Sequence, residues 1–588
     1  MNAFMPRRST PAIAAALLFG LAANAFAQAP RDWKQPLFQD KKIGHVLNRL
    51  GFGPRPGDAA RVREMGVERW IEMQLWPEKI DDELVNQKLS GLKTLQMSAQ
   101  DLMLAQLSDK GKVARQIKQT QQLRKGKNPV EAQPVKQSVK LNARQQQTLQ
   151  MIEELEIAAG TSVQAIGELQ LDKTTRAVES NRQLFEVLVD FWSNHFNLDV
   201  KKNAVRVLKV VDERDVIRPH VFGKFRDLLG ASAKSPAMLI YLDNASSTRE
   251  MNFPIRNPNR INKKRGGINE NYARELMELH TLGVDGGYTQ TDVQEVARCF
   301  TGWSVDRNSG AFIFRKFAHD DGEKTVLGQT IPASGGMQDG ERVLDILAKS
   351  PATAEFIAHK LCVRLVADEP PISVVDKAAK TFQNTDGDLR AVVKTIITSP
   401  EFFSTLSYRA KIKSPFEYAV SATRALGGTV VIPDASTPRG RSSLVSDGAA
   451  SVRANQNNKR KNAAKTLNRS IAEMGQPLFS YQAPTGYSED SREWVSSGAL
   501  VSRLNFALAL TGDEISNVIA TPTILLKGVD EHELETTINR LTEQLLANDV
   551  SVGTRSTLQR EIVGEKDAPI DRKKLTALIL GSPEFQRH

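Results

Sequence analysis

Apolar residues recur along most of the chain at spacings of three and four positions, the pattern of amphipathic helices. The pattern is clearest after Ser350, where one continuous apolar stripe contains Ala354, Ile357, Ala358, Leu361, Cys362 and Leu365. It repeats over 389–397, and Thr291 is expected to begin a further helix, with Gln294 placed for a capping box. Strand-like alternation is confined to 311–317 and 429–432. The pattern predicts an all-α fold, a large multi-helix domain with a few short β elements.

Five Ser-Pro pairs predict helix starts. A serine oxygen accepts a free N–H of the first turn, and proline has no N–H to leave unpaired there. The serines of these pairs are Ser235, Ser350, Ser399, Ser414 and Ser582. Residues 388–402 and 571–585 align without a gap, and both end in Ser-Pro-Glu-Phe. We interpret this repeat as one helix-turn-helix geometry that occurs twice. It does not indicate a solenoid, because no fixed short period links the copies.

Three segments depart from the helical pattern. Residues 1–27 combine Arg7-Arg8, an apolar run and Ala25-Phe26-Ala27, which is typical of a secretory signal peptide cut near Ala27. The arginine pair leaves the twin-arginine route open beside the general one. Residues 110–147 and 433–469 are polar insertions that bury too little apolar surface to offset the entropy of ordering. We therefore expect a single large helical domain over 28–588, periplasmic or secreted, with no transmembrane segment in the mature chain.

The composition does not change the prediction of an exported, mainly helical protein. The 588 residues carry 79 Lys and Arg against 68 Asp and Glu, a net charge of +11, which is concentrated in the two insertions and in 256–265. These basic segments lack interleaved aromatic residues, so nucleic acid is not an expected partner. Two cysteines exclude a disulfide scaffold. In an oxidising compartment, Cys299 and Cys362 either pair or remain buried thiols.

Most catalytic signatures are absent. The chain has no H-E-x-x-H zinc motif, no G-x-S-x-G nucleophile elbow and no G-x-x-x-x-G-K phosphate loop. The glycines of 51–57 alternate with prolines, which predicts a rigid turn and not a nucleotide loop. Candidate chemistry therefore rests on clusters of polar residues.

The densest cluster lies within 269–283. On a helix, Asn271, Arg274, Glu275 and Glu278 share one face, opposite an apolar face that includes His280. Two carboxylates three positions apart beside an arginine can bind a cation or act as acid and base. An ordinary solvated face with intrahelical charge pairs has the same pattern, so both interpretations remain open.

Three smaller clusters accompany it. In 191–197, His195 borders an aromatic stripe beside Asn194, and it is a candidate general base or metal ligand. Asp243 and Asn244 follow an apolar helix, where they either end the helix or bind a ligand. In 319–324, His319 precedes Asp320 and Asp321, which suit either a hard cation or a surface turn.

The order of these motifs resembles the bacterial domain-of-unknown-function 1800 family. The matching pieces are 45–53, 191–197, 238–244, 269–283, 286–290, 300–303, 319–328, 399–402 and Pro484-Thr485-Gly486-Tyr487 with Trp494. The resemblance implies an exported, mainly helical protein without an established activity. It also implies a frequent genetic neighbour, the domain-of-unknown-function 1501 family, which resembles the alkaline-phosphatase and sulfatase group.

The family pattern makes particular polar residues stronger candidates for a defined role. It includes Asn194, His195, Asp243, Asn244, Asn271, Arg274, Glu275, Glu278, His319 and Asp320. Such residues form either a site or a buried polar network that fixes helix packing. We expect the helix over 269–283 to lie near the centre of the domain, packed against 191–197.

Two functions remain open beside a purely structural role. The first is an envelope binding or accessory protein that acts with a partner of the 1501 family or on an anionic glycan. The second is a metal-assisted hydrolase with a divalent metal as cofactor. In it, His195, Glu275 and Glu278 are catalytic, and the other residues of the family pattern bind the ligand.

Overall fold

The computed structural model describes residues 32–106, 160–249, 267–434, 465–562 and 569–588, and most of these residues are helical. The described strands are short and occur in three separate pairs. The prediction of an all-α fold with a few short β elements is confirmed.

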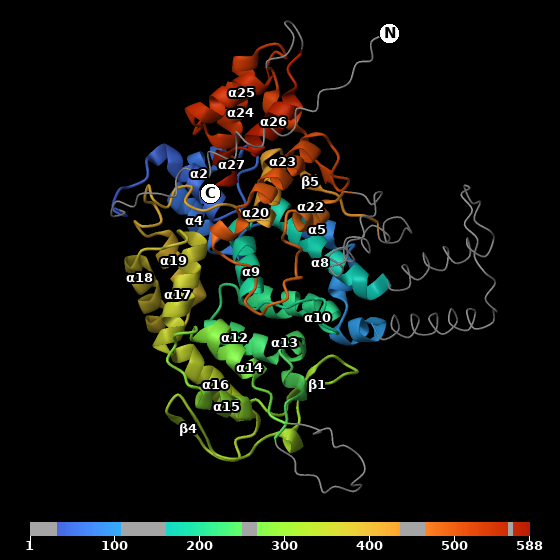
Figure 1. Ribbon diagram of the computed structural model, residues 1–588, viewed down its shortest axis with the longest axis vertical. Helices are drawn as coiled ribbons and strands as arrows, with labels where there is room; N and C mark the ends of the chain where they lie inside the picture. Colours follow the sequence, from blue (N-terminus) through green and yellow to red (C-terminus); the bar gives the residue numbers. More distant parts are fainter. Residues whose placement is uncertain (1–31, 107–159, 250–266, 435–464, 563–568) are drawn as a thin grey trace, which may run out of the picture.

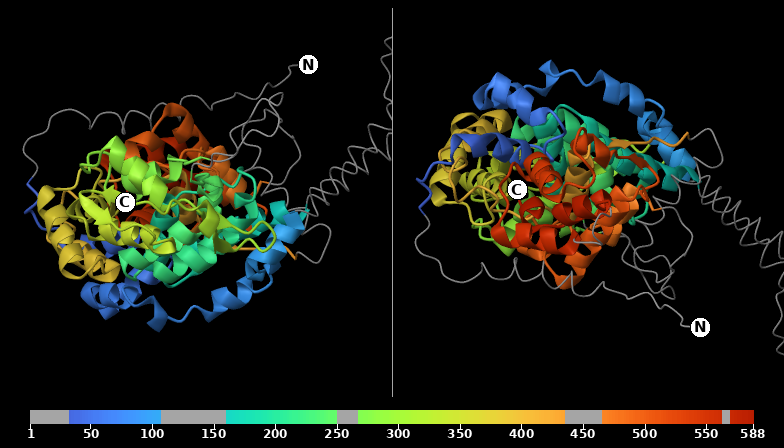
Figure 2. Two further views of the ribbon diagram at one scale, coloured as in Figure 1. Left: turned by 90° about the horizontal axis from the view of Figure 1, so that it is seen from below. Right: turned by 90° about the horizontal axis from the view of Figure 1, so that it is seen from above.

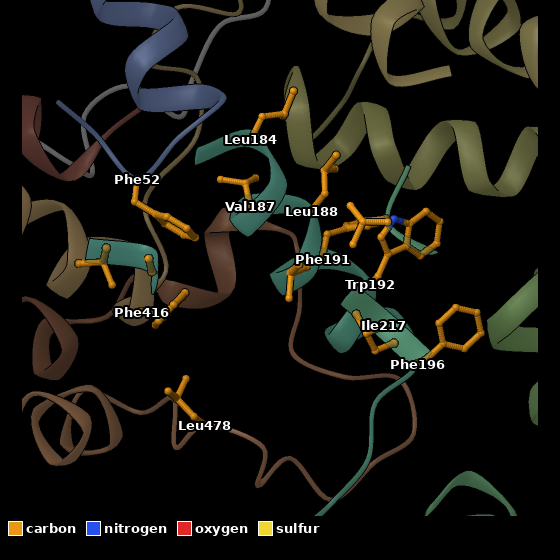
Figure 3. Close-up of a cluster of buried hydrophobic side chains, with 14 of the residues drawn as sticks. Phe52, Leu184, Val187, Leu188, Phe191, Trp192, Phe196, Ile217, Phe416 and Leu478 are labelled. Carbon is orange, nitrogen blue, oxygen red and sulfur yellow. The ribbon is translucent and has the colours of Figure 1, made fainter. Parts of the chain in front are cut away.

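The centre of the molecule is built around one helix that is buried on almost every side. The central helices are α8 (Gly160–Glu179), α9 (Gln183–His195), α10 (Val205–Val211) and α20 (Pro415–Ala425). Figure 3 shows Leu184, Val187, Phe191 and Trp192 extending from α9, and all four are buried. Ten of the thirteen residues of α9 are buried, polar ones among them, so α9 lies in the core of the domain.

The N-terminal helices run along one flank of this centre (Figure 2). They are α2 (Gln39–Arg49), α3 (Asp58–Met65), α4 (Val67–Gln74) and α5 (Glu83–Leu89), with the short turns η1 (Pro77–Lys79) and η2 (Lys93–Gln96). Residues 51–57 form the expected turn. Gly53 has φ +92°, and a Cβ there would lie 2.7 Å from Ser421 Oγ of α20, so the turn and the central helix are in close contact.

A second flank consists of α17 (Pro351–Leu365), α18 (Ile372–Asn384) and α19 (Leu389–Ile397), which pack side by side (Figure 1). The predicted apolar stripe of α17 is buried in the core from Ala354 to Leu365. This part of the prediction is confirmed residue by residue.

One end of the long axis holds the helices that follow α10 (Figure 1). These are η3 (Asp212–Ile217), α11 (Arg218–His220), α12 (Phe225–Lys234), α13 (Pro236–Tyr241), η4 (Asn244–Ser246), α14 (Asn271–Glu275), η5 (Leu276–Thr281), α15 (Gln290–Cys299), η6 (Lys316–Ala318) and α16 (Met337–Lys349). The helix predicted over 269–283 is present as α14 and the π-helical turn η5. It packs against the end of α9 as expected, with the rings of Phe196 and His280 5.0 Å apart.

The opposite end holds most of the C-terminal helices. The elements after α20 are α22 (Leu467–Glu473), η7 (Ser491–Trp494), α23 (Ser497–Thr511), η8 (Pro522–Leu526), α24 (Leu534–Leu546), α25 (Val552–Ile562), α26 (Arg572–Leu580) and α27 (Pro583–Gln586). Helices α24, α25 and α26 lie farthest from α12–α16 (Figure 1).

The strands form three antiparallel pairs. They are β1 (Trp303–Val305) with β2 (Phe312–Phe314), β3 (Lys324–Val326) with β4 (Gln329–Ile331), and β5 (Thr429–Val430) with β6 (Val518–Ile519). Strands β2 and β5 fall within the two predicted segments. The other four were not predicted, because a strand of two or three residues shows alternation only where a longer run surrounds it, as around β2 and β5.

Four of the five Ser-Pro pairs begin helices, namely α13, α17, α20 and α27. The prediction for Ser399 was wrong, because Ser399-Pro400 lies in a turn after α19. That turn still uses the serine, whose Oγ accepts the N–H of Phe402 at 3.1 Å.

The predicted start of α15 was also wrong. Thr289 caps the helix in place of Thr291, and the capping box pairs it with Asp292 in place of Gln294. Thr289 Oγ1 accepts the N–H of Asp292, and the Asp292 carboxylate accepts the N–H of Thr289. A carboxylate is a stronger acceptor than an amide in this position, which favours a cap at Thr289, two positions before the predicted one.

The sequence repeat corresponds to a repeated local structure. Asp388 caps α19 by accepting from Ala391 N, and Asp571 caps α26 by accepting from Lys574 N. The copies differ after the helix, since only the second continues into a further helix, α27.

The buried apolar side chains form one cluster that extends from Val46 to Phe585. The predicted signal (1–27) and the insertion at 110–147 lie outside the described residues. Of the insertion at 433–469, only 433–434 and 465–469 are described, and α22 begins within it at Leu467. In the described ranges, no helix is long and apolar enough to cross a membrane. Cys299 and Cys362 are both buried, free thiols.

We predict that Ser414→Ala lowers the free energy of unfolding by about 1 kcal/mol, because it removes the N-cap of a central helix. Chemical denaturation measures the change. The matched control is Ser556→Ala, an exposed serine inside α25, which should stay within about 0.5 kcal/mol of the parent. Equal effects at both positions would contradict the role of the cap.

Candidate functional site

A pocket of about 310 Å³ lies where the end of α9, the middle of α17 and residues 481–489 meet. We call residues 481–489 the covering segment. The pocket is lined by Phe191, Asn194, His195, Lys360, Tyr481, Thr485, Gly486, Tyr487, Ser488 and Glu489. It combines aromatic walls with a few convergent polar groups, the usual make-up of a small-molecule site.

Two asparagines at the end of α9 hold the covering segment in place. The side chain of Asn194 donates to Tyr487 O at 2.8 Å and accepts from Tyr487 N at 2.7 Å. Asn197 donates to Tyr481 O and to Ala483 O. Gly486 allows this close approach, because a Cβ there would lie 2.3 Å from Asn194 O. The wall of the pocket is therefore fixed by the last turn of a core helix.

The polar floor of the pocket is a lysine–histidine pair. Lys360 Nζ lies 3.0 Å from His195 Nδ1, and His195 Nε2 lies 3.2 Å from the backbone oxygen of His280. A carbonyl oxygen only accepts, so Nε2 carries the proton and Nδ1 presents its lone pair to the ammonium group. His195 thus acts as a neutral acceptor with a fixed tautomer.

The surroundings keep this histidine neutral and weaken the charge on the lysine. Burial, and then the Lys360 cation and His280, lower the pKa of His195 well below its usual value. Burial lowers the pKa of Lys360 to about 8, and the charge of Glu489 only partly offsets it. Both shifts follow from removing charged groups from water.

Glu489 is the carboxylate in the pocket lining, and it is already engaged. Its side chain pairs with Arg364 at 3.1 Å and accepts from Asn194 at 3.2 Å. Among the described residues, Lys360 forms no ion pair. Its ammonium group therefore faces the pocket without a carboxylate of its own.

Arg364 lies one turn after Lys360 on α17. Its ion pair with Glu489 keeps that carboxylate from pairing with the lysine. Its guanidinium contacts Asp190 at 3.2 Å and Glu417 at 3.0 Å as well as Glu489. Burial opposes the charge on Arg364, but these three carboxylates outweigh it and raise its pKa. Five donors in a rigid fork suit such a buried carboxylate cluster.

The carboxylates predicted to be catalytic do not line this pocket. Glu278 accepts from Tyr288 at 3.2 Å, and Arg274 pairs with Glu270. Burial, and then the neighbouring charge of Glu278, raise the pKa of Glu275. These side chains lie on the outer face of α14 and η5, opposite the buried His280.

The residues predicted around 243 and 271 connect backbone segments. Asn244 is buried and donates to Phe300 O and Trp303 O, both at 3.1 Å. Asp243, with φ +63°, pairs with Lys202 at 2.8 Å. Asn271 donates to Leu242 O. These contacts connect 242–244 to Lys202, Asn271, Phe300 and Trp303.

His319 belongs to a separate buried cluster. Its Nε2 lies 3.2 Å from Asp339 Oδ2, and the same oxygen accepts from Lys324 Nζ at 2.7 Å. All three side chains are wholly buried. Asp320 lies beside this cluster and binds the Arg298 guanidinium at 3.0 and 3.1 Å. In the described residues, the carboxylate of Asp320 thus has an arginine as its partner.

No three histidine, cysteine, aspartate or glutamate side chains come together as a metal ion requires, within the residues that the structure describes. Of the ten candidates from the sequence, the pocket contains Asn194 and His195. Sequence reasoning missed Lys360. A signal was available in Lys360 and Arg364, two cations four positions apart at the edge of an apolar stripe, which repel unless each has a separate task.

Fold and pocket together define a mainly helical protein with one core and a lysine-based polar pocket. A family model described as a protein of unknown function (DUF1800) matches residues 45–587, so the chain belongs to that family, as its motif order indicated. Neither a curated protein nor a solved structure matches the chain.

We predict that Lys324→Met lowers the free energy of unfolding by about 3 kcal/mol or more, because it leaves the Asp339 carboxylate buried beside a histidine without its ammonium partner. The double variant Lys324→Met with Asp339→Leu should recover much of this loss. Denaturant unfolding measures both.

The matched control is Lys573→Met, which removes an exposed ion pair with Asp513. It should change stability by less than about 1 kcal/mol. A Lys324→Met variant as stable as this control would contradict the structural role of the buried cluster.

Proposed function

We propose that this protein is an exported binding or accessory protein of the bacterial envelope, and that its pocket holds the anionic group of a ligand such as an acidic glycan. The observation that supports this proposal is the ammonium group of Lys360, which faces a cavity without a carboxylate partner among the described residues. A ligand carboxylate or sulfate would supply the missing charge.

The walls of the pocket suit the rest of such a ligand. Tyr481 and Tyr487 lie with their ring centroids 4.5 Å apart, and Phe191 lines the same cavity. Aromatic side chains offer large, rigid apolar areas at low entropic cost. Thr485 and Ser488 add hydroxyl groups that donate or accept hydrogen bonds. The combination favours a polar ligand that has an apolar face, as a sugar ring does.

Export and the partner are further parts of the proposal. The pattern of residues 1–27 supports export. The family resemblance supports a protein of the domain-of-unknown-function 1501 family as partner. Recovery of such a protein with the tagged chain from envelope extracts would support the partnership, and repeated recovery without it would argue against it.

We predict that Lys360→Met weakens the binding of galacturonate oligomers at least tenfold, because methionine keeps the apolar stem but removes the charge-assisted hydrogen bond. Isothermal titration calorimetry measures the dissociation constant. Lys377→Met is the matched control, since Lys377 is exposed and lies on α18, outside the pocket lining. Equal affinity of Lys360→Met and the parent would contradict the proposal.

Affinity should also fall as pH rises. The ligand binds the protonated form of Lys360, whose pKa is about 8, so binding is full below that value and is lost above it. Between pH 7 and pH 9 the dissociation constant should rise about tenfold. His195 and His280, whose pKa values burial lowers, do not titrate in this window. A constant affinity over this range would contradict anchoring by a Lys360 amine whose pKa is about 8.

A further inference from the structure

Lys360 differs from the buried lysines in that it lines a pocket without forming an ion pair among the described residues. Lys411 also lines a pocket, but its ammonium group pairs with Asp368. Lys209 pairs with Asp212 and Glu213, and Lys324 pairs with Asp339. Lys413 donates to Ser421 and to Phe585 O and is 3% exposed. None of these three lines a described pocket. Lys360 lines one and is partly exposed.

The neighbours of Lys360 supply what amine chemistry requires. His195 Nδ1 lies 3.0 Å from Lys360 Nζ, and its lone pair points at the amine because Nε2 is engaged with His280 O. A neutral imidazole in this position can take a proton from the lysine nitrogen and return it. Tyr481, Tyr487 and Phe191 give the cavity apolar walls beside the amine.

We propose that the Lys360 amine is a nucleophile that forms an imine with small aldehydes entering this pocket, and that His195 transfers the protons. This inference rests on the pocket of the proposed function but does not depend on an acidic glycan as its ligand. The cavity, at about 310 Å³, is at the small end of ligand sites and suits a compact carbonyl compound.

The reaction balances without an oxidant or reductant. The nitrogen lone pair of Lys360 attacks the carbonyl carbon, a C–N bond forms, and the C=O π electrons move to oxygen. His195 Nδ1 takes a proton from the nitrogen and delivers it to that oxygen, which gives a carbinolamine. The nitrogen lone pair then forms C=N as the C–O bond breaks. The hydroxyl leaves with the second nitrogen proton as water, again carried by His195.

A lowered pKa supports this use of the amine. At a pKa of about 8, Lys360 has a far larger share of free amine at neutral pH than an ordinary lysine with a pKa near 10.4. Burial produces the shift, as it does in other lysines that form Schiff bases. An acidic ligand bound to the ammonium form should therefore slow imine formation.

The test uses the full chain with glyceraldehyde and cyanoborohydride at pH 7.5, followed by peptide mass mapping. The expected result is modification of Lys360 at least ten times faster than that of Lys573, an exposed lysine in the same sample. Because the comparison is made within the parent protein, it does not depend on any variant folding. Equal rates at the two lysines would overturn the proposal.

Two variants then test the proton carrier. His195→Gln should slow modification of Lys360 at least fivefold and change the pH profile of its rate. His359→Gln, an exposed histidine one position before the lysine, should change neither. An unchanged rate and pH profile in His195→Gln would overturn the role of the histidine.

Failure of this proposal can be told apart from failure of the proposed function. Galacturonate oligomers that do not bind, with selective trapping of Lys360 intact, would contradict the acidic ligand alone. Binding that depends on Lys360, with aldehyde modification spread evenly over exposed lysines, would contradict the imine alone.

Discussion

The burial of α9 is the constraint on which the rest of this structure depends. The last turn of a helix placed in the core has little contact with water, so its polar groups are stabilised by partners inside the protein. Asn194 and Asn197 find theirs in the covering segment, and His195 finds His280 O and Lys360. These bonds bring together segments that lie 85 to 293 positions from their partners in the chain. The pocket is the space that they enclose.

The burial of α9 also gives the two cations of α17, Lys360 and Arg364, different partners. Arg364 satisfies three carboxylates, one of which is Glu489 from the covering segment. With Glu489 held in this way, Lys360 has a histidine in place of a counter-ion. An amine in such surroundings is both an anchor for anions and a reactive nucleophile, and the balance between the two depends on its protonation. One lysine therefore links the proposed binding function to the proposed imine chemistry.

Hydrophobic periodicity predicted much of the fold but little of the candidate site. The stripe on α17 was predicted because apolar spacing is local. The packing of 269–283 against 191–197 is a tertiary contact, and it was expected from the family pattern and not from spacing. The strands β1, β3, β4 and β6 were missed because strands this short show a period only within a longer alternating run, as β2 and β5 do. Asn194 and His195 were predicted as site residues, but Lys360 was not, since its partner His195 lies 165 positions away. Glu275 and Glu278 looked like a paired site on one helical face, yet tertiary packing leaves that face outside the pocket. Their helix also changes at Leu276 into a π-helical turn, a change that a regular helical period does not predict.

The central claim is that burial, without a carboxylate partner among the residues that the structure describes, makes the Lys360 amine less basic than an ordinary lysine. The titration of Lys360 tests that claim most directly. Nuclear magnetic resonance of the lysine side-chain carbons, assigned with Lys360→Arg, would follow the titration of this one amine in the folded chain. The account predicts a midpoint at about pH 8. A midpoint above pH 10, the range of an ordinary solvated or ion-paired lysine, would show that Lys360 stays an ordinary ammonium group, and would contradict both the reactive amine and the predicted pH dependence of binding.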